Sequence, residues 1–287
     1  MIENLPNVDP SGLPEAALPK CKRRWFQFSL RSLLAFTLIC AIPCAWLAKK
    51  IEKKRRDREA VEAFIKLGAR VYYDYEVANA GPKPPGPDWL RKFLGENFFS
   101  EVDSVLWGES NWSPPSKHGN LTDAELEQVG KLTELHTLKL LGDDVNVTDA
   151  GLANLKGLTQ LQQLHLAAPN VTDAGLENLQ GLTQLETLVL MDARVTDAGL
   201  ENLNRLTRLQ SLSLARTNVT DAGLVHLKGL TKLQYLGLWN TKVSGVGLAN
   251  LKGMSQLRVL ELWGVNKVSD AAVKDLQKAL PNCKIER

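Results

Sequence analysis

The chain has 287 residues, of which 44% are hydrophobic and 23% are charged, and its formal net charge is +3. This length suits one or two domains, and so small a net charge does not indicate a nucleic-acid-binding protein. The four cysteines form no CxxC pair and the four histidines are scattered. The composition therefore favours neither a disulfide framework nor a zinc site.

The longest apolar stretch covers residues 25–48, which contain one charged residue, Arg31, and carry Trp25 and Trp46 near the two ends. A helix of 24 residues is about 36 Å long and can cross a hydrocarbon core of about 30 Å. We therefore expect one transmembrane helix over 25–48, after a disordered polar leader over 1–24. A cleaved signal peptide is the alternative, because small residues occur near the end of the stretch at Ala41, Ala45 and Ala48.

A basic segment follows, with seven lysines and arginines between Lys49 and Arg58. We expect residues 49–70 to form a juxtamembrane helix, and residues 25–58 together to contact membrane lipid. The positive-inside rule leans toward a cytoplasmic C-terminal part in a single-pass protein of the cell membrane. The side stays open, because the flank at Lys20–Arg24 is also basic.

Residues 71–120 show a weaker pattern, with strand-like runs at 71–75 and 102–107 and a short helical run at 88–94. This order predicts divergent repeats that cap the N-terminal end of a larger array.

The phrase VTDAGL dominates the rest of the chain. It occurs at Val147, Val171, Val195 and Val219, with variants at Leu121, Val243 and Val268, so that the spacing is 24 to 26 residues throughout. Each unit also contains LxxLxL, as at Leu185-Leu188-Leu190. Leucines two apart share one face of a strand, whereas leucines three apart, as in the phrase after VTDAG, share one face of a helix. Residues 121–287 are therefore expected to form an α/β solenoid with a parallel sheet on its concave face and a C-terminal cap.

The threonine and aspartate of each phrase have a local explanation. Thr172 is placed to cap a helix, and Asp173 falls in the first turn, where the helix dipole favours a carboxylate. A calcium site is the alternative, but calcium needs several oxygens around one point. One aspartate per unit makes a row instead, so we expect no metal site.

These two phrases together resemble leucine-rich repeats of the ribonuclease-inhibitor-like and cysteine-containing classes. The unit is shorter than the first class and lacks the cysteines of the second. The whole layout resembles the membrane-anchored repeat proteins of planctomycete-type bacteria. The resemblance implies a right-handed horseshoe segment and specifies the fold far better than the function.

In such a fold the residues between the leucines of each strand project from the concave face. The last of these positions in each unit is apolar throughout, and aromatic residues gather in the final units. Exposed aromatic clusters are frequent binding hot spots. We therefore hypothesise a partner-binding patch formed by Tyr235, Trp239, Trp263, Met191, Val259 and Glu261. The alternative is that the loop leaving each strand buries this position.

Enzyme motifs are absent from the sequence, which has no Walker loop, GxSxG or HExxH. His165, Lys139 and Ser213 project from the same expected face, but nothing orients a base among them. We expect no catalytic residues, no cofactor and a role as a membrane-anchored module that binds another protein. An extracytoplasmic adhesion protein and a purely structural scaffold are the alternatives, and the oligomeric state stays open.

Overall fold

The computed structural model describes residues 30–77, 84–98, 100–108 and 120–287. The chain divides into two compact units, Met1–Lys49 and Lys50–Arg287. The expected leader over 1–24 and the first residues of the expected transmembrane segment, 25–29, lie outside the described part.

Helix α1 (Leu30–Lys66) contains most of the apolar segment and the basic segment in one continuous helix. Two separate helices had been expected here. Among the residues that the structure describes, no helix combines the length and the hydrophobicity needed to cross a membrane. In the first unit, the side chains of Cys44, Trp46 and Leu47 are exposed.

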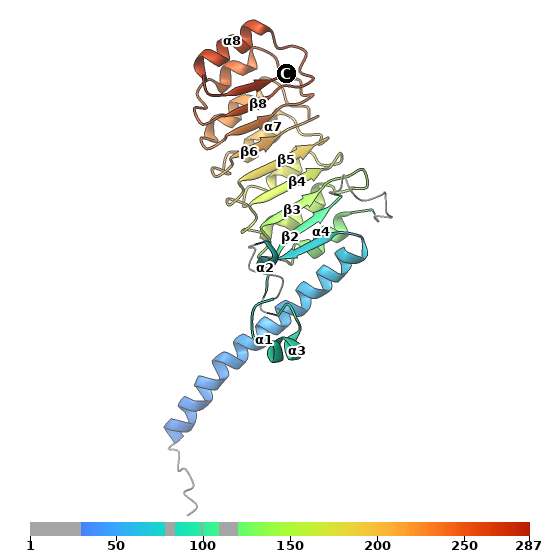
Figure 1. The fold of residues 1–287 in the computed structure, drawn as a ribbon, viewed down its shortest axis with the longest axis vertical. Coiled ribbons are helices and arrows are strands. Elements are labelled where there is room, and N and C mark those ends of the chain that lie inside the picture. Colours follow the sequence, from blue (N-terminus) through green and yellow to red (C-terminus); the bar gives the residue numbers. More distant parts are fainter. Residues whose placement is uncertain (1–29, 78–83, 99, 109–119) are drawn as a thin grey trace, which may run out of the picture. The chain divides into compact units, whose positions relative to one another are not determined.

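The second unit is built on one sheet of nine strands that follow one another in chain order (Figure 1). The strands are β1 (Arg70–Tyr73), β2 (Val102–Trp107), β3 (Thr137–Leu140), β4 (Gln163–Ala167), β5 (Thr187–Met191), β6 (Ser211–Ser213), β7 (Tyr235–Gly237), β8 (Val259–Glu261) and β9 (Lys284–Glu286). All neighbouring pairs from β2 to β9 are parallel. The parallel sheet expected from the repeats is therefore confirmed.

The N-terminal end of the sheet differs from the repeats. Strand β1 pairs with β2 in the antiparallel direction and leads into the short helix α2 (Asp74–Val77), where the sequence had suggested strand up to residue 75. Helix α3 (Asp88–Leu94) follows. An antiparallel edge strand is not a leading repeat, because stacked repeat strands all run the same way. The buried side chains of Ala60, Val61 and Phe64 in α1 join the same apolar core.

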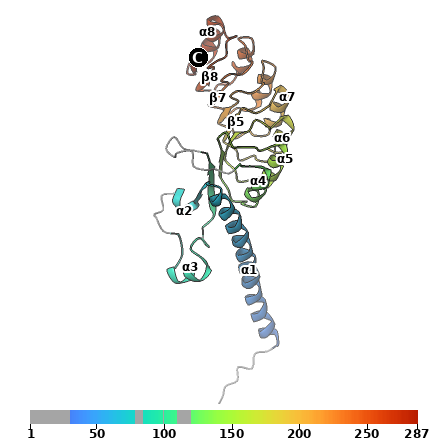
Figure 2. The ribbon, with the colours of Figure 1, turned by 90° about the vertical axis from the view of Figure 1, so that its right-hand side faces the viewer.

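Helices cover one face of the sheet, and Figure 2 shows α4 to α7 stacked along one side of the strands. They are α4 (Asp123–Val129), α5 (Asp149–Ala153), α6 (Asp173–Glu177) and α7 (Asp197–Leu200), followed after the sixth strand by 3₁₀ turns η3 (Gly223–Gly229) and η4 (Gly247–Leu251) and finally by α8 (Asp270–Ala279). Shorter 3₁₀ turns, η1 (Asn154–Gly157) and η2 (Glu201–Leu203), extend α5 and α7. The predicted alternation of strand and short helix is confirmed, with tighter 3₁₀ geometry in the later units.

The repeated leucines fill the space between the strands and the helices. Leu164, Leu188, Leu212 and Leu236 lie in register on consecutive strands and are fully buried. One continuous apolar core runs from Ala60 to Cys283. Each unit therefore depends on its neighbours for burial, as expected for a linear array.

The VTDAGL phrase also joins consecutive units through a pair of hydrogen bonds, here called the latch, which the sequence did not reveal. The threonine caps its own helix: the Thr172 hydroxyl accepts from the Ala174 amide at 3.3 Å. The aspartate side chain reaches the next unit, where the Asp173 carboxylate accepts from the Thr196 amide at 2.7 Å and from its hydroxyl at 2.6 Å. The carboxylates therefore bind specific hydrogen-bond donors of the next unit, and the helix dipole alone does not account for them. The same pair of bonds joins Asp123, Asp149, Asp197 and Asp221 to the unit that follows each.

The glycine of the phrase leaves room for this latch. A Cβ atom on Gly199 would overlap the Asp173 carboxylate, and the equivalent glycines stand in the same relation to the preceding aspartate at 151, 175, 223 and 247. The last junction lacks the latch, because Gly245 replaces the aspartate and Ala272 replaces the glycine. A Cβ on Gly245 would lie 2.8 Å from the Cβ of Ala272, so the two exchanges compensate in space.

Candidate functional site

The face of the sheet opposite the helices, here called the strand face, carries the residues between the leucines. In β4 and β5 these residues are half-exposed or exposed, whereas the leucines are buried. Strand register aligns them in rows across the sheet. The central row contains Lys139, His165, Val189, Ser213, Gly237 and Glu261.

Tight turns follow the strands β5, β6 and β7. Asp192, Arg216 and Asn240 adopt positive φ angles of 60°, 57° and 52°, in the left-handed region. Their amides donate to the next unit: the Arg216 N–H bonds the Trp239 carbonyl at 2.8 Å, and the Asn240 N–H bonds the Trp263 carbonyl at 2.8 Å. These bonds bring the backbones of Trp239 and Trp263 side by side, one unit apart.

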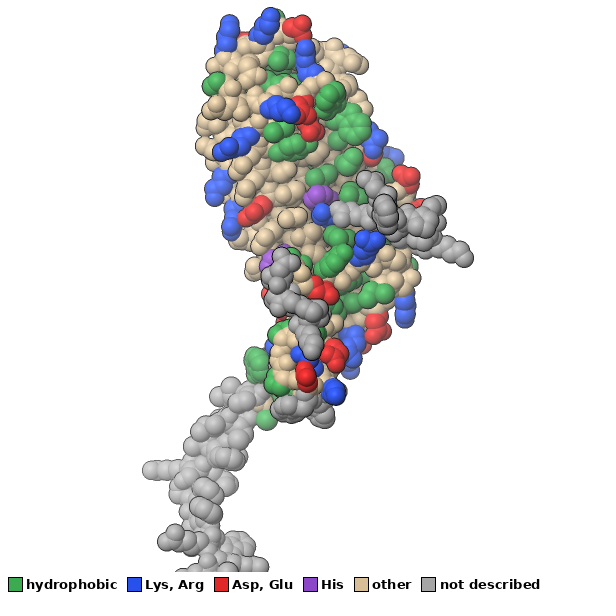
Figure 3. All heavy atoms as spheres, in the orientation of Figure 1, with side chains coloured by type: hydrophobic (Ala, Val, Ile, Leu, Met, Phe, Trp, Pro, Cys, Tyr) green, Lys and Arg blue, Asp and Glu red, His purple; other side chains and the backbone are tan. Residues whose placement is uncertain are grey.

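The exposure of the last row settles an alternative that the sequence left open. Trp239 is 37% exposed and Trp263 is 48% exposed, so the loops do not bury them. Ala215, one unit earlier, is only 3% exposed, and Met191 is half-buried. The strand face is drawn in Figure 3, where hydrophobic side chains form a strip along it. The aromatic end of this row is therefore open to solvent, whereas the alanines contribute little accessible surface.

Tyr235 and Glu261 form a hydrogen-bonded pair on β7 and β8. The Tyr235 hydroxyl donates to the Glu261 Oε2 at 2.6 Å. Burial, and then the bond and the charge of Glu261, raise the pKa of the Tyr235 hydroxyl well above its usual value. Gly237 leaves room beside this pair, because a Cβ there would lie 3.1 Å from the Tyr235 oxygen, which is a tight contact.

The six hypothesised partner-binding residues are not all neighbours. Tyr235, Val259 and Glu261 lie on the adjacent strands β7 and β8, and Trp239 and Trp263 follow those strands. Met191 ends β5, two strands from β7. At about 4.8 Å per strand, its backbone is roughly 10 Å from theirs.

Two residues that the sequence did not single out also belong to this area. The guanidinium of Arg216 lies over the indole of Trp239, 5.2 Å from the ring centroid, and its Nη2 pairs with Asp192 at 2.7 Å. Their position in the sequence could have identified them, because each directly follows a residue of the last row. We call Asp192, Arg216, Trp239, Trp263, Tyr235 and Glu261 the aromatic patch.

The residues considered for catalysis do not converge. Ser213 on β6 and His165 on β4 are separated by β5, which puts their backbones roughly 10 Å apart. In the described part of the chain, no group of three or more histidine, cysteine, aspartate or glutamate side chains is arranged to hold a metal ion. The aspartates considered for calcium are instead the inter-unit latches.

A hollow of about 320 Å³ lies at the other end of the strand face. The short helix α2 forms one wall of it and the strands form its floor. Its lining residues are Tyr72, Glu76, Val77, Ser104, Leu106, Thr137, Lys139 and Gln163.

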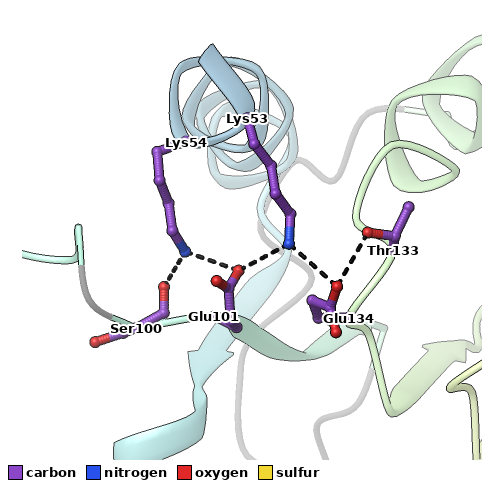
Figure 4. Close-up of polar contacts among 6 residues, drawn as sticks. All are labelled: Lys53, Lys54, Ser100, Glu101, Thr133 and Glu134. Atoms are coloured by element: carbon purple, nitrogen blue, oxygen red, sulfur yellow. Dashed lines mark hydrogen bonds and ion pairs between the residues drawn. The ribbon is translucent and has the colours of Figure 1, made fainter. Parts of the chain in front are cut away.

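A charged cluster joins α1 to the start of the array (Figure 4). Lys53 bonds Glu101 at 3.3 Å and Glu134 at 3.2 Å, and Lys54 bonds Glu101 at 2.8 Å. Burial tends to raise the pKa of Glu101, but Lys54 and Lys53 outweigh it and the pKa is lowered. Asp57 beside them is 7% exposed, and burial raises the pKa of its carboxyl. The cluster holds the part of α1 that belongs to the second unit, residues 50–66, against the array, and it has no arrangement typical of catalysis.

Comparison with known protein families and with curated proteins gives no match for this sequence. Among solved structures, internalin C2 of Listeria monocytogenes is similar with a TM-score of 0.45 and 27% identity, over 64% of this chain and 70% of that one. A second internalin of that species, inlF, gives 0.42 and 30%, over 55% of this chain and 49% of the other. The Arabidopsis receptor kinase HAESA, in complex with a peptide hormone and a co-receptor, gives 0.37 and 19%, over 50% and 26%.

The repeating unit itself defines the fold. Each unit from β3 to β8 places the middle leucine of LxxLxL on a parallel strand, buries all three leucines in the shared core and returns through a short helix or 3₁₀ turn. This arrangement is a leucine-rich-repeat solenoid.

Proposed function

We propose that this chain is a non-catalytic binding module that contacts another protein through the aromatic patch. One observation carries the proposal: two tryptophans, 37% and 48% exposed, lie side by side at the end of adjacent strands. Exposed tryptophan beside arginine and tyrosine is the composition typical of interface hot spots.

The rigidity of the support favours the same function. The backbones of Trp239 and Trp263 are fixed by the turn bonds, and the strands beneath them bury Leu236 and Leu260 completely. Presenting the rings in one arrangement lowers the ordering cost of binding. We infer no catalytic role, because Tyr235 and Glu261 bond each other and, in the part of the chain that the structure describes, no third side chain bonds this pair.

Site-specific photo-crosslinking in the full chain tests the proposal. A photoreactive amino acid replaces Val259, on β8 beside the patch, in one variant and Val225, exposed on the helical face, in the control. We expect a discrete protein adduct from position 259 and none from position 225. Equal adducts from both positions, or none from either, refute binding through the patch.

Alanine variants supply an independent check on the same proposal. Trp239→Ala with Trp263→Ala should abolish the adduct formed from a photoreactive residue at Val259, while the urea midpoint of unfolding changes little. A large drop in that midpoint would show instead that the tryptophans act in packing.

We further propose that residues 25–48 anchor the module in a membrane, with residues 49–58 at the lipid headgroups. The support is the sequence: one charge in 24 residues, flanking tryptophans and a following basic run. We also propose, from the sequence motifs, that the chain is related to the anchored repeat proteins of planctomycete-type bacteria and that its repeats are of the ribonuclease-inhibitor-like class.

Extraction of membranes from cells that express the full chain tests the anchor. We expect the chain to stay with the membranes in high salt and in alkaline carbonate, and to be released by detergent. Release by salt alone would refute a spanning anchor. Protease treatment of intact cells then decides on which side the solenoid lies, for which the charge bias favours the cytoplasm.

A further inference from the structure

The chain contains its own example of how the aromatic patch binds a cation. Arg216 sits in the left-handed turn position of one unit and lies over Trp239 of the next, 5.2 Å from the centroid. Asp192, from the unit before, pairs with the same guanidinium at 2.7 Å. One guanidinium is thus held between a carboxylate and an indole.

The following unit keeps the indole and the turn of this arrangement but not the ion pair, because Arg216 itself stands in the turn position that corresponds to Asp192. Trp263 occupies the place of Trp239, and Asn240 occupies the turn position of Arg216, with a similar positive φ of 52°. The Asn240 side chain is too short to cover the indole. Its side-chain amide instead lies against Gly264, where an added Cβ would overlap the Asn240 Oδ1. Among the described residues, Arg216 is the one cation stacked on an indole of this patch, and it covers Trp239. Trp263 carries no stacked cation there and is 48% exposed.

Two carboxylates, those of Glu261 and Glu286, lie on the two strands next to this second tryptophan. Glu261 precedes Trp263 by two residues and therefore projects from the same face, roughly 7 Å along the strand. Glu286 lies beside Glu261 in the register of β8 and β9. Glu261 accepts one bond from Tyr235 through its Oε2, and Glu286 pairs with Lys284 at 2.6 Å. Neighbouring like charges on adjacent strands disfavour each other, so a further cation would be stabilising here.

We propose that Trp263, Glu261 and Glu286 bind an arginine side chain presented by the protein partner. The guanidinium stacks on Trp263 as Arg216 stacks on Trp239, and it donates to Glu261, a strand residue that supplies the negative charge which the turn residue Asp192 supplies to Arg216. Arginine fits better than lysine, because its planar fork stacks on an indole while its N–H groups reach a carboxylate. The inference deepens the proposed function and depends on the same patch.

Fluorine NMR of the full chain labelled with 5-fluorotryptophan tests this directly, with Trp263→Phe used to assign the resonance. The probes are blocked pentapeptides, Gly-Gly-X-Gly-Gly, with arginine, citrulline or glutamate at the centre. We expect the arginine peptide to shift the Trp263 resonance with about tenfold tighter binding than citrulline, which has nearly the same shape without the charge. The glutamate peptide should cause no shift.

Two variants make the test specific to the missing cation. Asn240→Arg should place an arginine of the chain itself over Trp263, move that resonance in the free protein and weaken the peptide about tenfold. Asn240→Gln is the matched uncharged control and should leave binding unchanged. Glu261→Gln should weaken the arginine peptide and leave the citrulline peptide unaffected.

The results separate this inference from the proposed function. Citrulline binding as tightly as arginine, or arginine binding equally well to the Asn240→Arg variant, overturns the arginine pocket. A crosslinked adduct at position 259 together with either result would keep the binding module and remove only the arginine. Arginine binding without any adduct would do the reverse.

Discussion

The latch between units makes a quantitative prediction at Asp197 and Gly223. Asp197 accepts from the Thr220 amide at 2.7 Å and from its hydroxyl at 2.5 Å, and a Cβ on Gly223 would overlap the Asp197 carboxylate. Asp197→Gly should cost about 3 kcal/mol, from about 1 kcal/mol for each half-exposed bond and about 1 kcal/mol for glycine in a helix. Gly223→Ala alone should cost about 2 kcal/mol through overpacking.

The double variant should be milder than the sum of these costs. With Asp197→Gly in place, the added methyl of Gly223→Ala meets no carboxylate, as Gly245 and Ala272 already show at the last junction. We therefore expect the double variant to lose about 3 kcal/mol instead of about 5, which is a coupling energy of about 2 kcal/mol.

Urea unfolding of the full chain, followed by far-ultraviolet circular dichroism, measures these free energies. Asp197→Ala with Gly223→Ala is the control. It should recover less of the loss, because a Cβ at the aspartate position stays in the way. Additive losses, within about 0.5 kcal/mol, would show that the glycine does not exist to accommodate the latch.

Three further predictions concern the leucine core, the charged cluster at α1 and the aromatic patch. Leu188→Ala should cost about 2–5 kcal/mol in urea unfolding, because Leu188 is fully buried in the middle of the array. Asp57→Asn should raise stability at neutral pH by about 1 kcal/mol, because it removes a buried charge whose Oδ1 has no hydrogen-bond partner among the described residues. Since burial raises the pKa of the Asp57 carboxyl above its ordinary value of about 3.8, the contribution of Asp57 to wild-type stability is complete below about pH 3.8 and is lost as the pH rises through the folded-state pKa. The thermal midpoint of the Asp57→Asn variant should show less of this fall, and parallel pH profiles would contradict the prediction. Tyr235→Phe should remove one phenol that ionises far above the usual range in an ultraviolet pH titration, since burial and Glu261 raise its pKa; a normal titration of all four tyrosines in the wild type would refute the pairing.

Local patterns in the sequence were enough to predict the repeat fold. The period of 24 to 26 residues, the strand phrase and the capping threonines are all local signals, and strand β2 was predicted at its observed bounds, Val102–Trp107. Leucine spacing identifies which face of an element is buried before any partner is known. The exposed position of each strand, and hence the candidate residues of the patch, followed from the same alternation.

The sequence predicted less well where contacts join different units. The aspartate latch bonds a threonine 23 residues later, so the helix-dipole explanation drawn from one unit missed its partner. The antiparallel direction of β1 likewise depends on pairing across a loop, which no local period encodes.

By itself, the sequence determined the class of fold, the buried leucines and the row to which the aromatic residues belong, because each follows from the period of a single unit. Only the tertiary structure decided that Trp239 and Trp263 are exposed, that Arg216 covers one of them, and that the other has carboxylates without a stacked arginine. These are relations between neighbouring units, and they depend on how closely the turns stack.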